Sequence, residues 1–169
     1  SGFSHPAVIT VALVLLISKG LERSGFIAVL GRKLQAYANS EIQFMISITF
    51  FAAILSSFMN NIGAMAMLLP ITLGICQKMN WNPSKFLIPL SFASILGGMN
   101  TKIGTPPNII ISEFRNDFAD KDFAFFDFSL AGVPVSILGI LFIALIGWRL
   151  IKLRPINSEN NPLIELEDY

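Results

Sequence analysis

The sequence predicts an all-α polytopic membrane protein with a re-entrant helical hairpin and a broken transmembrane helix. Hydrophobic residues make up 53% of the 169 residues and charged residues only 14%, against about 25% charged residues in soluble domains. Residues 42–77 and 128–148 carry no charge, and residues 86–112 carry only Lys102. Uncharged apolar runs of about 18 or more residues are candidate membrane spans. Polar residues and glycines interrupt two of these runs.

Composition also excludes several functional classes. Cys76 is the single cysteine, so neither a disulfide framework nor a cysteine-based metal site is expected. The net charge is +1, and the basic residues form no stripe suited to a nucleic-acid partner. His5 is the only histidine, and it lacks a second catalytic residue. We therefore expect no enzyme and no organic cofactor.

The chain has the organisation of one repeat taken from a longer protein. Residues 1–151 are expected to form an N-terminal transmembrane repeat, and residues 152–169 a polar cytoplasmic tail or linker. The apolar run at 7–17 predicts a helix. Leucines and aromatics alternate with basic residues over 20–38, which favours an amphipathic helix on the membrane surface over a short transmembrane turn.

The predicted hairpin covers residues 42–79, and the polar interruption within it covers residues 56–63, Ser-Ser-Phe-Met-Asn-Asn-Ile-Gly. Two arrangements fit this pattern: two full crossings joined by a tight turn, or a re-entrant hairpin whose tip stops inside the membrane. A turn outside the membrane would usually carry a charge, and this one carries none. The uncharged tip favours the hairpin.

The predicted broken helix covers residues 85–118. Gly97 and Gly98 stop its first half, and Pro106-Pro107 suit the first turn of its second half. Irregular backbone at membrane depth is tolerated where it is buried in protein or lines a cavity. Secondary transporters place ion and substrate sites at such breaks. Residues 113–127 are expected to form an acidic outer loop, and residues 129–150 the last span.

The two interruptions resemble signatures of the divalent-anion:sodium symporter family, within the ion transporter superfamily. The first resemblance lies in residues 58–65, Phe-Met-Asn-Asn-Ile-Gly-Ala-Met, followed by residues 68–71, Leu-Leu-Pro-Ile. The second runs from residues 91–94, Ser-Phe-Ala-Ser, through Gly97-Gly98 to residues 101–108, Thr-Lys-Ile-Gly-Thr-Pro-Pro-Asn. The resemblance implies two inverted repeats, of which this chain holds the N-terminal one and lacks the C-terminal one. It also implies a homodimer that works as an elevator, in the plasma membrane of a bacterium or archaeon.

The resemblance also implies the binding residues. A sodium ion would lie between the hairpin tip and the unwound loop, held by oxygens of Ser56, Asn60, Asn61 and Gly104. The helix C-terminal ends there suit a cation, and the N-terminal ends suit a small inorganic or dicarboxylate anion. The residues implied for the anion are Asn60, Asn61, Ile62, Lys102, Thr105, Pro106 and Asn108. Sequence alone does not choose among dicarboxylate, citrate and sulfate.

Lys102 is the one charge within residues 86–112. An unpaired charge at membrane depth costs about 2.5–3.5 kcal/mol on insertion scales, so a partner is expected. The candidates are carbonyls of the unwound loop, a residue of the missing repeat, or the anion. We expect Lys102 to face the site; the alternative is that it snorkels away from it.

Two other functions are weighed against the symporter. A cation/proton antiporter or arsenite-type permease of the same superfamily would be expected to carry an acidic residue within the membrane. None occurs between residues 42 and 111. A non-transporting, channel-like or structural membrane subunit is the second alternative, and it would need no inverted partner repeat.

Overall fold

The structure is a computed structural model, and its described part is helical, with no strand among the described residues. The described residues are 8–9, 12–13, 16, 19–20, 34, 40–119, 121–147 and 149. The predicted surface helix at 20–38 and the tail at 152–169 lie outside these residues, apart from single positions. The prediction of an all-helical chain is confirmed for the described part.

Helices α3 (Glu41–Phe58) and α4 (Asn61–Met79) are joined by two residues only, Met59 and Asn60. The interruption is therefore shorter than the predicted 56–63. Ser57 lies within α3, and its hydroxyl is 2.9 Å from Ala53 O, one turn back. Asn60 begins α4 because its side-chain oxygen accepts from Ile62 N at 3.3 Å, as an N-cap.

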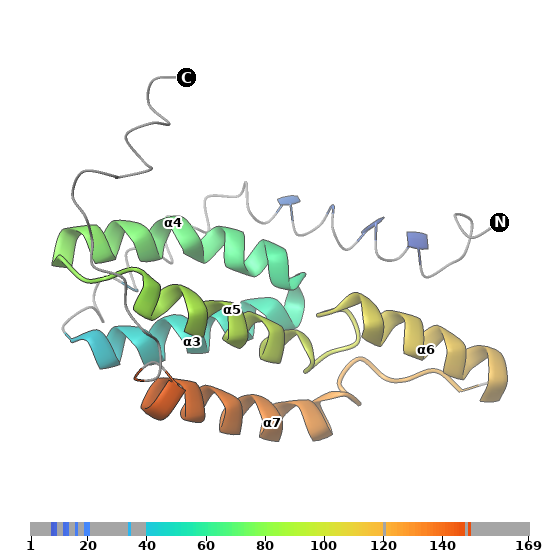
Figure 1. Cartoon of the computed structure of the whole chain (residues 1–169). Helices are drawn as coiled ribbons and strands as arrows, with labels where there is room; N and C mark the ends of the chain where they lie inside the picture. Colours follow the sequence, from blue (N-terminus) through green and yellow to red (C-terminus); the bar gives the residue numbers. More distant parts are fainter. Residues whose placement is uncertain are drawn as a thin grey trace.

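Helix α5 (Ser84–Gly98) ends at the predicted glycine pair, and α6 (Pro106–Ala119) begins at the predicted proline pair. Residues 99–105 between them are not helical. Helix α7 (Ser129–Phe142) follows and continues into a π-helical turn, η2 (Ile143–Gly147). Figure 1 shows α3, α4, α5 and α7 lying alongside one another, with α6 projecting from one end of this bundle.

Helix α5 is central because it packs against α3, α4 and α7. The buried core lies among these helices and includes Phe44, Ile48, Met67, Leu68, Phe86 and Leu90. Many large hydrophobic side chains instead face outward, among them Phe50, Ile54, Phe92 and Leu138. A helix that is apolar on both its inner and outer faces suits a lipid environment.

Among the described residues, three helical stretches are long and apolar enough to cross a membrane: Glu41–Phe58, Asn61–Met79 and Ser129–Gly147. The last of these joins α7 and η2. Helix α5 is apolar but shorter. The chain is therefore a multi-pass membrane protein.

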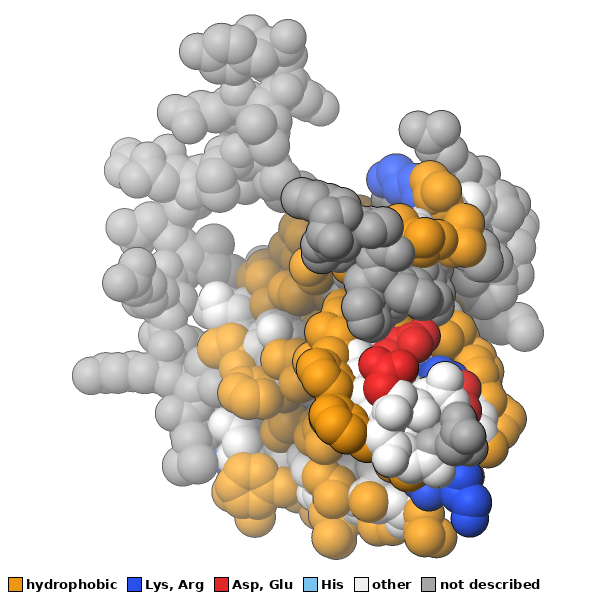
Figure 2. All heavy atoms as spheres, turned by 90° about the vertical axis from the view of Figure 1, so that its right-hand side faces the viewer, with side chains coloured by type: hydrophobic (Ala, Val, Ile, Leu, Met, Phe, Trp, Pro, Cys, Tyr) orange, Lys and Arg blue, Asp and Glu red, His pale blue; other side chains and the backbone are white. Residues whose placement is uncertain are grey.

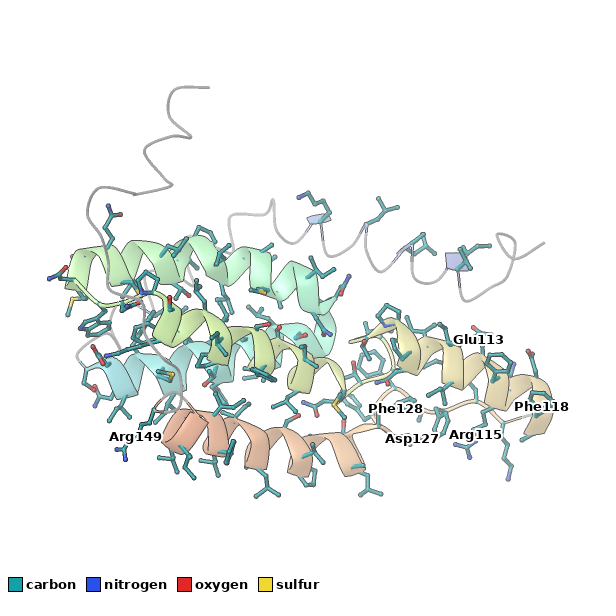
Figure 3. The ribbon with its side chains drawn as sticks, viewed as in Figure 1. Glu113, Arg115, Phe118, Asp127, Phe128 and Arg149 are labelled. Carbon is teal, nitrogen blue, oxygen red and sulfur yellow. The ribbon has the colours of Figure 1, made fainter. Side chains whose placement is uncertain are left out.

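The two ends of the bundle differ in their charged residues. Arg149 lies at one end, whereas Glu113, Arg115 and Asp127 lie at or beside α6, at the other end (Figure 3). Lys85 Nζ forms an ion pair with Glu41 at 2.9 Å, which joins the starts of α5 and α3. Figure 2 views the molecule from the α6 end and shows hydrophobic side chains over much of the described surface, with charged groups gathered at this end.

Candidate functional site

The candidate site lies where the C-terminal ends of α3 and α5 meet the N-terminal end of α4. Two glycines let the backbones approach this closely. A Cβ on Gly97 would lie 2.2 Å from Ala53 O, and a Cβ on Gly98 would lie 2.1 Å from the side-chain amide of Asn61. Small residues allow such contacts between helices in membranes. The Asn61 amide consequently reaches the end of α5.

Three oxygen atoms surround one side of the Asn61 amide. They are Ser56 Oγ at 2.7 Å, Ser94 O at 3.1 Å and Gly104 O at 3.3 Å. Ser56 is fully buried and Ser94 almost so. The three oxygens come from α3, α5 and the unwound segment 99–105, so Asn61 on α4 links all four parts of the chain.

The amide fits this place in two orientations. With its nitrogen inward, Nδ2 lies within hydrogen-bonding distance of all three oxygens and can donate its two protons to two of them at a time. With its oxygen inward, Ser56 Oγ donates to Oδ1 at 2.7 Å, and Oδ1 meets the two carbonyl oxygens with no proton between them. In that second orientation the nitrogen faces only donor groups on the outer side of the amide. Hydrogen bonding by protein groups alone therefore favours the nitrogen-inward orientation.

In the oxygen-inward orientation four neutral oxygen atoms lie together, and two of them, Ser94 O and Gly104 O, receive no proton from the amide. Such a cluster can bind a cation. Among the described residues there is no group of three or more His, Cys, Asp or Glu side chains that could hold a metal ion. A site built from hydroxyl, amide and carbonyl oxygens therefore carries no formal charge of its own.

A second polar network holds the unwound segment against α3. Ser57 Oγ lies 2.9 Å from both Ala53 O and Gly97 O, either of which can accept its single proton, and Asn100 Nδ2 donates to Ser57 Oγ at 3.3 Å. Thr101 Oγ1 donates to Ser57 O. The last carbonyls of a helix lack partners within that helix, and these side chains supply them for α3 and α5.

Helix α7 contributes two serines to the same network. Ser136 Oγ donates to Leu96 O at 2.7 Å and to Asn100 Oδ1 at 3.0 Å. Ser129 Oγ donates to Asn100 O at 2.6 Å. Among the described residues, every buried side-chain nitrogen and oxygen has a hydrogen-bond partner. These hydrogen bonds tie the unwound segment to both α3 and α7.

Of the residues expected to bind sodium, Ser56, Asn61 and Gly104 come together, whereas Asn60 caps α4. Its side-chain oxygen is engaged by Ile62 N. The Ile62 side chain is 75% exposed. Asn60 and Ile62 therefore lie at the rim of the site, and their proposed roles are untested by these contacts.

The remaining residues expected to bind the anion lie in and after the unwound segment. Asn108 Nδ2 donates to Thr101 O at 2.9 Å, which closes the segment onto the first turn of α6. Thr105 O accepts from Asn108 N at 3.1 Å, and Pro106 is the first residue of α6. The Asn108 amide is therefore already used to hold the backbone.

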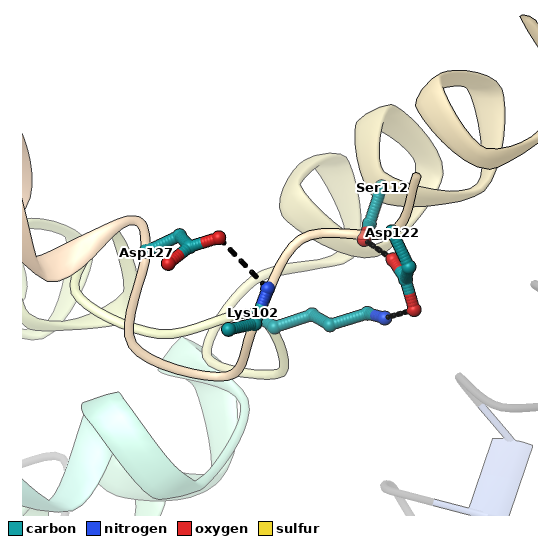
Figure 4. A network of polar contacts seen from close by, with 5 residues as sticks. Lys102, Ser112, Asp122 and Asp127 are labelled. Atoms are coloured by element: carbon teal, nitrogen blue, oxygen red, sulfur yellow. Dashed lines mark hydrogen bonds and ion pairs between the residues drawn. The ribbon is translucent and has the colours of Figure 1, made fainter. Parts of the chain in front are cut away.

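The partner of Lys102 differs from the expected ones. Its ammonium group forms an ion pair with Asp122 (Figure 4), 20 positions later in the chain. Asp122 also accepts from Ser112 of α6, and Lys102 N donates to Phe125 O at 3.0 Å. The acidic segment expected to be a free outer loop instead returns along α6 to the unwound segment. This ion pair could not be predicted from the sequence because α6 and the turn after it separate Lys102 from Asp122 along the chain.

The Lys102–Asp122 pair is expected to be stronger at neutral pH than in acid. The hydrogen bond from Lys102 and the one from Ser112 hold the pKa of Asp122 below its ordinary value. A carboxylate with a lowered pKa stabilises the fold above the pKa it has when unfolded, and this stabilisation is lost as the pH falls through the folded pKa. Asp122→Asn should therefore lower the melting temperature of the full-length protein at neutral pH, and the difference should vanish in strong acid.

A double-mutant cycle distinguishes this structural tie from contact with the anion. If Lys102 acts only through Asp122, the coupling free energy should be about 0.2–1 kcal/mol, as for partly exposed pairs, and Lys102→Leu and Asp122→Asn should change anion affinity alike. A change in anion affinity confined to Lys102→Leu would instead support the expectation that Lys102 faces the site.

Sequence reasoning missed several residues of the site. Ser94 and Gly98 were visible as part of the second signature, one turn apart at the end of α5, but nothing local indicates that the Ser94 carbonyl turns toward Asn61. Asn100 and Ser136 carried no signal beyond being polar residues in apolar surroundings. Asp122 could have been suspected, since Lys102 needed a partner and 113–127 is the nearest acidic segment.

Comparisons with known proteins give the family and the relatives of this chain. Residues 1–161 match the family described as citrate transporter. The chain is 35% identical over 151 residues to the uncharacterized transporter YfbS of Escherichia coli (strain K12), which covers 89% of this chain and 25% of that protein. It is 31% identical over 172 residues to the uncharacterized transporter sll0640 of Synechocystis sp., which covers 100% of this chain and 28% of that protein.

A third relative carries a more specific name. The chain is 27% identical over 152 residues to sodium/sulfate cotransporter 1 of Chlamydomonas reinhardtii, which covers 86% of this chain and 17% of that protein. The chain therefore spans 17–28% of the length of these relatives.

Proposed function

Because this chain belongs to the citrate transporter family, a family of membrane transporters and not of enzymes, we propose that it forms the N-terminal repeat of a sodium-coupled symporter. The transported substrate would be a small divalent anion, a dicarboxylate or sulfate. The name of the Chlamydomonas relative, sodium/sulfate cotransporter 1, supports both the coupling ion and the anion class.

The observation that carries the proposal is the group of oxygens around Asn61. Hard oxygen ligands without a fixed carboxylate suit a monovalent cation better than a divalent one, which is usually bound by carboxylates. The C-terminal ends of α3 and α5 add the negative ends of two helix dipoles. In this proposal, Ser56 Oγ, Asn61 Oδ1, Ser94 O and Gly104 O bind the sodium ion, with Asn60 close by.

The anion would lie on the other side of Asn61, at the N-terminal ends of α4 and α6. The positive end of a helix dipole favours the negative charge of carboxylate and sulfate oxygens; Pro106 and Pro107 at the start of α6 have no backbone N–H group to donate. Asn60, Ile62, Thr105 and Pro106 belong to these first turns. Lys102 lies close to Thr105 in the chain and would add positive charge near the start of α6, although its ammonium group also pairs with Asp122.

The exposed side chains of α6 support a re-entrant hairpin. Ile110, Ile111 and Phe114 are each about half exposed, as expected for a helix whose first turns lie in lipid. If α6 enters the membrane, the unwound segment before it and the hairpin tip beside that segment both lie at membrane depth. In the proposed full-length protein, an inverted second repeat completes the site, and a homodimer moves the site across the membrane as an elevator.

The proposal is tested by uptake in proteoliposomes that contain the full-length protein. An inward sodium gradient should drive accumulation of radiolabelled sulfate or succinate, and an equal potassium gradient should not. Asn61→Ala should reduce sodium-driven uptake by about tenfold or more, since a buried polar group left without its partner costs about 1–3 kcal/mol.

Asn116→Ala is the matched control, because Asn116 is exposed on the surface of α6. This variant should transport as the parent does. Uptake that is indifferent to sodium, or that survives in Asn61→Ala with the parent's sodium dependence, would refute the proposed function.

A further inference from the structure

We propose that Thr101 is a positioning residue of the candidate cation site, and that its hydroxyl holds the oxygens of Ser56 and Gly104 at the spacing that a sodium ion requires. This inference rests on the proposed function and adds to it the residue that sets cation selectivity. Thr101 is not itself a ligand in this arrangement, because its hydroxyl is already engaged both as a donor and as an acceptor.

Thr101 is buried in the middle of the unwound segment. Within residues 99–105 only Thr101 and Gly104 are buried, and Thr101 is 1% exposed. Its hydroxyl donates to Ser57 O, near the C-terminal end of α3, and accepts from Gly104 N at 3.2 Å. A hydroxyl has one proton to donate and can accept as well. This one side chain therefore joins the end of α3 to the far end of the unwound segment.

Both of the joined parts carry oxygens of the candidate site. Ser57 directly follows Ser56 in α3, and the last carbonyls of a helix have no partner within that helix. The Thr101 hydroxyl supplies such a partner and so holds the last turn of α3 in place beside Ser56. On its other side it holds the backbone of Gly104, whose carbonyl oxygen belongs to the group around Asn61.

The position of Gly104 is limited from the opposite side by close packing. A Cβ on Gly104 would lie 2.5 Å from Gly98 O and 3.0 Å from Ser56 O, so its backbone lies directly against the ends of α5 and α3. This contact prevents a closer approach, and the hydrogen bond to Thr101 prevents movement away. Without the hydroxyl, Gly104 N and Ser57 O would each lose a buried partner, and the spacing of the oxygens would become looser.

The spacing of the oxygens decides which cation fits best. Groups that orient a metal ligand change the affinity for the metal although they do not touch it. Selectivity between cations of the same charge depends on the size of the cavity and on the field of its oxygens. A looser spacing should weaken the binding of sodium more than that of the larger potassium ion. Loss of the hydroxyl should therefore lower both the sodium affinity and the preference for sodium over potassium.

Thr101→Val tests the inference because it removes the hydroxyl and keeps the branched shape of the side chain. The sodium concentration that gives half-maximal uptake should rise by about two- to tenfold, the effect of losing one hydrogen bond. Thr101→Ser keeps the hydroxyl and should restore most of the sodium affinity. Proteoliposomes with the full-length protein and radiolabelled sulfate, or succinate where sulfate is not transported, give these values at varied sodium and potassium concentrations. A purely structural role would instead lower the maximal rate and leave the half-saturating sodium concentration unchanged.

Thr72→Val is the matched control. Thr72 is fully buried in α4, and its hydroxyl donates to Leu68 O at 2.7 Å. It lies about three helical turns from Asn61, so the variant loses a buried hydroxyl away from the site. Its half-saturating sodium concentration and its preference for sodium over potassium should equal those of the parent.

An unchanged half-saturating sodium concentration in Thr101→Val would overturn the inference, as would an equal rise in Thr72→Val. If Thr101→Val does not fold, Thr101→Cys takes its place. A thiol is only a weak donor and a weak acceptor, so the half-saturating sodium concentration should rise in this variant too, and the parent's value would overturn the inference. Failure of the proposed function looks different, because the parent protein itself would then transport the anion without any dependence on sodium.

Discussion

Replacing Gly97 with alanine is expected to lower the free energy of unfolding of the full-length protein. The added Cβ would lie 2.2 Å from Ala53 O, 2.4 Å from Ala53 Cα and 2.6 Å from Ala53 C, all of them backbone atoms of α3. Since backbone cannot rotate away, α5 must move. Overpacking of this kind costs about 1–3 kcal/mol and occasionally more. The displacement would also stretch the Ser57–Gly97 hydrogen bond.

Gly74→Ala is the matched control for this prediction. Gly74 lies within α4, and a Cβ there would meet no atom within 4 Å. Alanine is a better helix former than glycine by about 1 kcal/mol, so this variant should melt at the parent's temperature or higher. The melting temperatures of the purified proteins in detergent measure both effects. Equal melting temperatures for Gly97→Ala and the parent would show that α3 and α5 are not in contact at this point.

A cysteine at position 60 should react with a membrane-impermeant thiol reagent from one side of the membrane only, and only in one transport state. The reason is that Asn60 is the partly exposed tip between α3 and α4, beside an unwound segment that the proposal places at membrane depth. The experiment uses Asn60→Cys together with Cys76→Ser, in a full-length protein without other cysteines. Sodium and anion should change its labelling rate.

Lys78→Cys provides the reference for sidedness, because Lys78 is exposed in the last turn of α4. It should label freely from its own side in every condition. If Asn60→Cys instead labels freely from the side opposite Lys78 in every condition, the tip is an outer loop between two full spans, and the re-entrant hairpin is wrong.

Helix boundaries were predictable from the sequence where local chemistry sets them. Gly97-Gly98 ended α5 and Pro106-Pro107 began α6 as expected, because glycine and proline act on the backbone directly. The break between α3 and α4 was predicted in the right place but too long. Serine and asparagine disfavour a helix on average, yet here Ser57 lies within α3 and bonds to its own helix, and Asn60 caps α4.

The sequence by itself determined the membrane class, the helix order and the two breaks, since uncharged length, glycine and proline act locally. It also indicated Ser56, Asn61 and Gly104 through a family resemblance. Only the tertiary structure decided that Ser94 joins them, that Asn100 is held by Ser57 and Ser136, and that Lys102 pairs with Asp122. These contacts depend on how closely α3 approaches α5 and on the return of the chain along α6. Such distances follow from the packing of whole helices, which no local pattern of residues specifies.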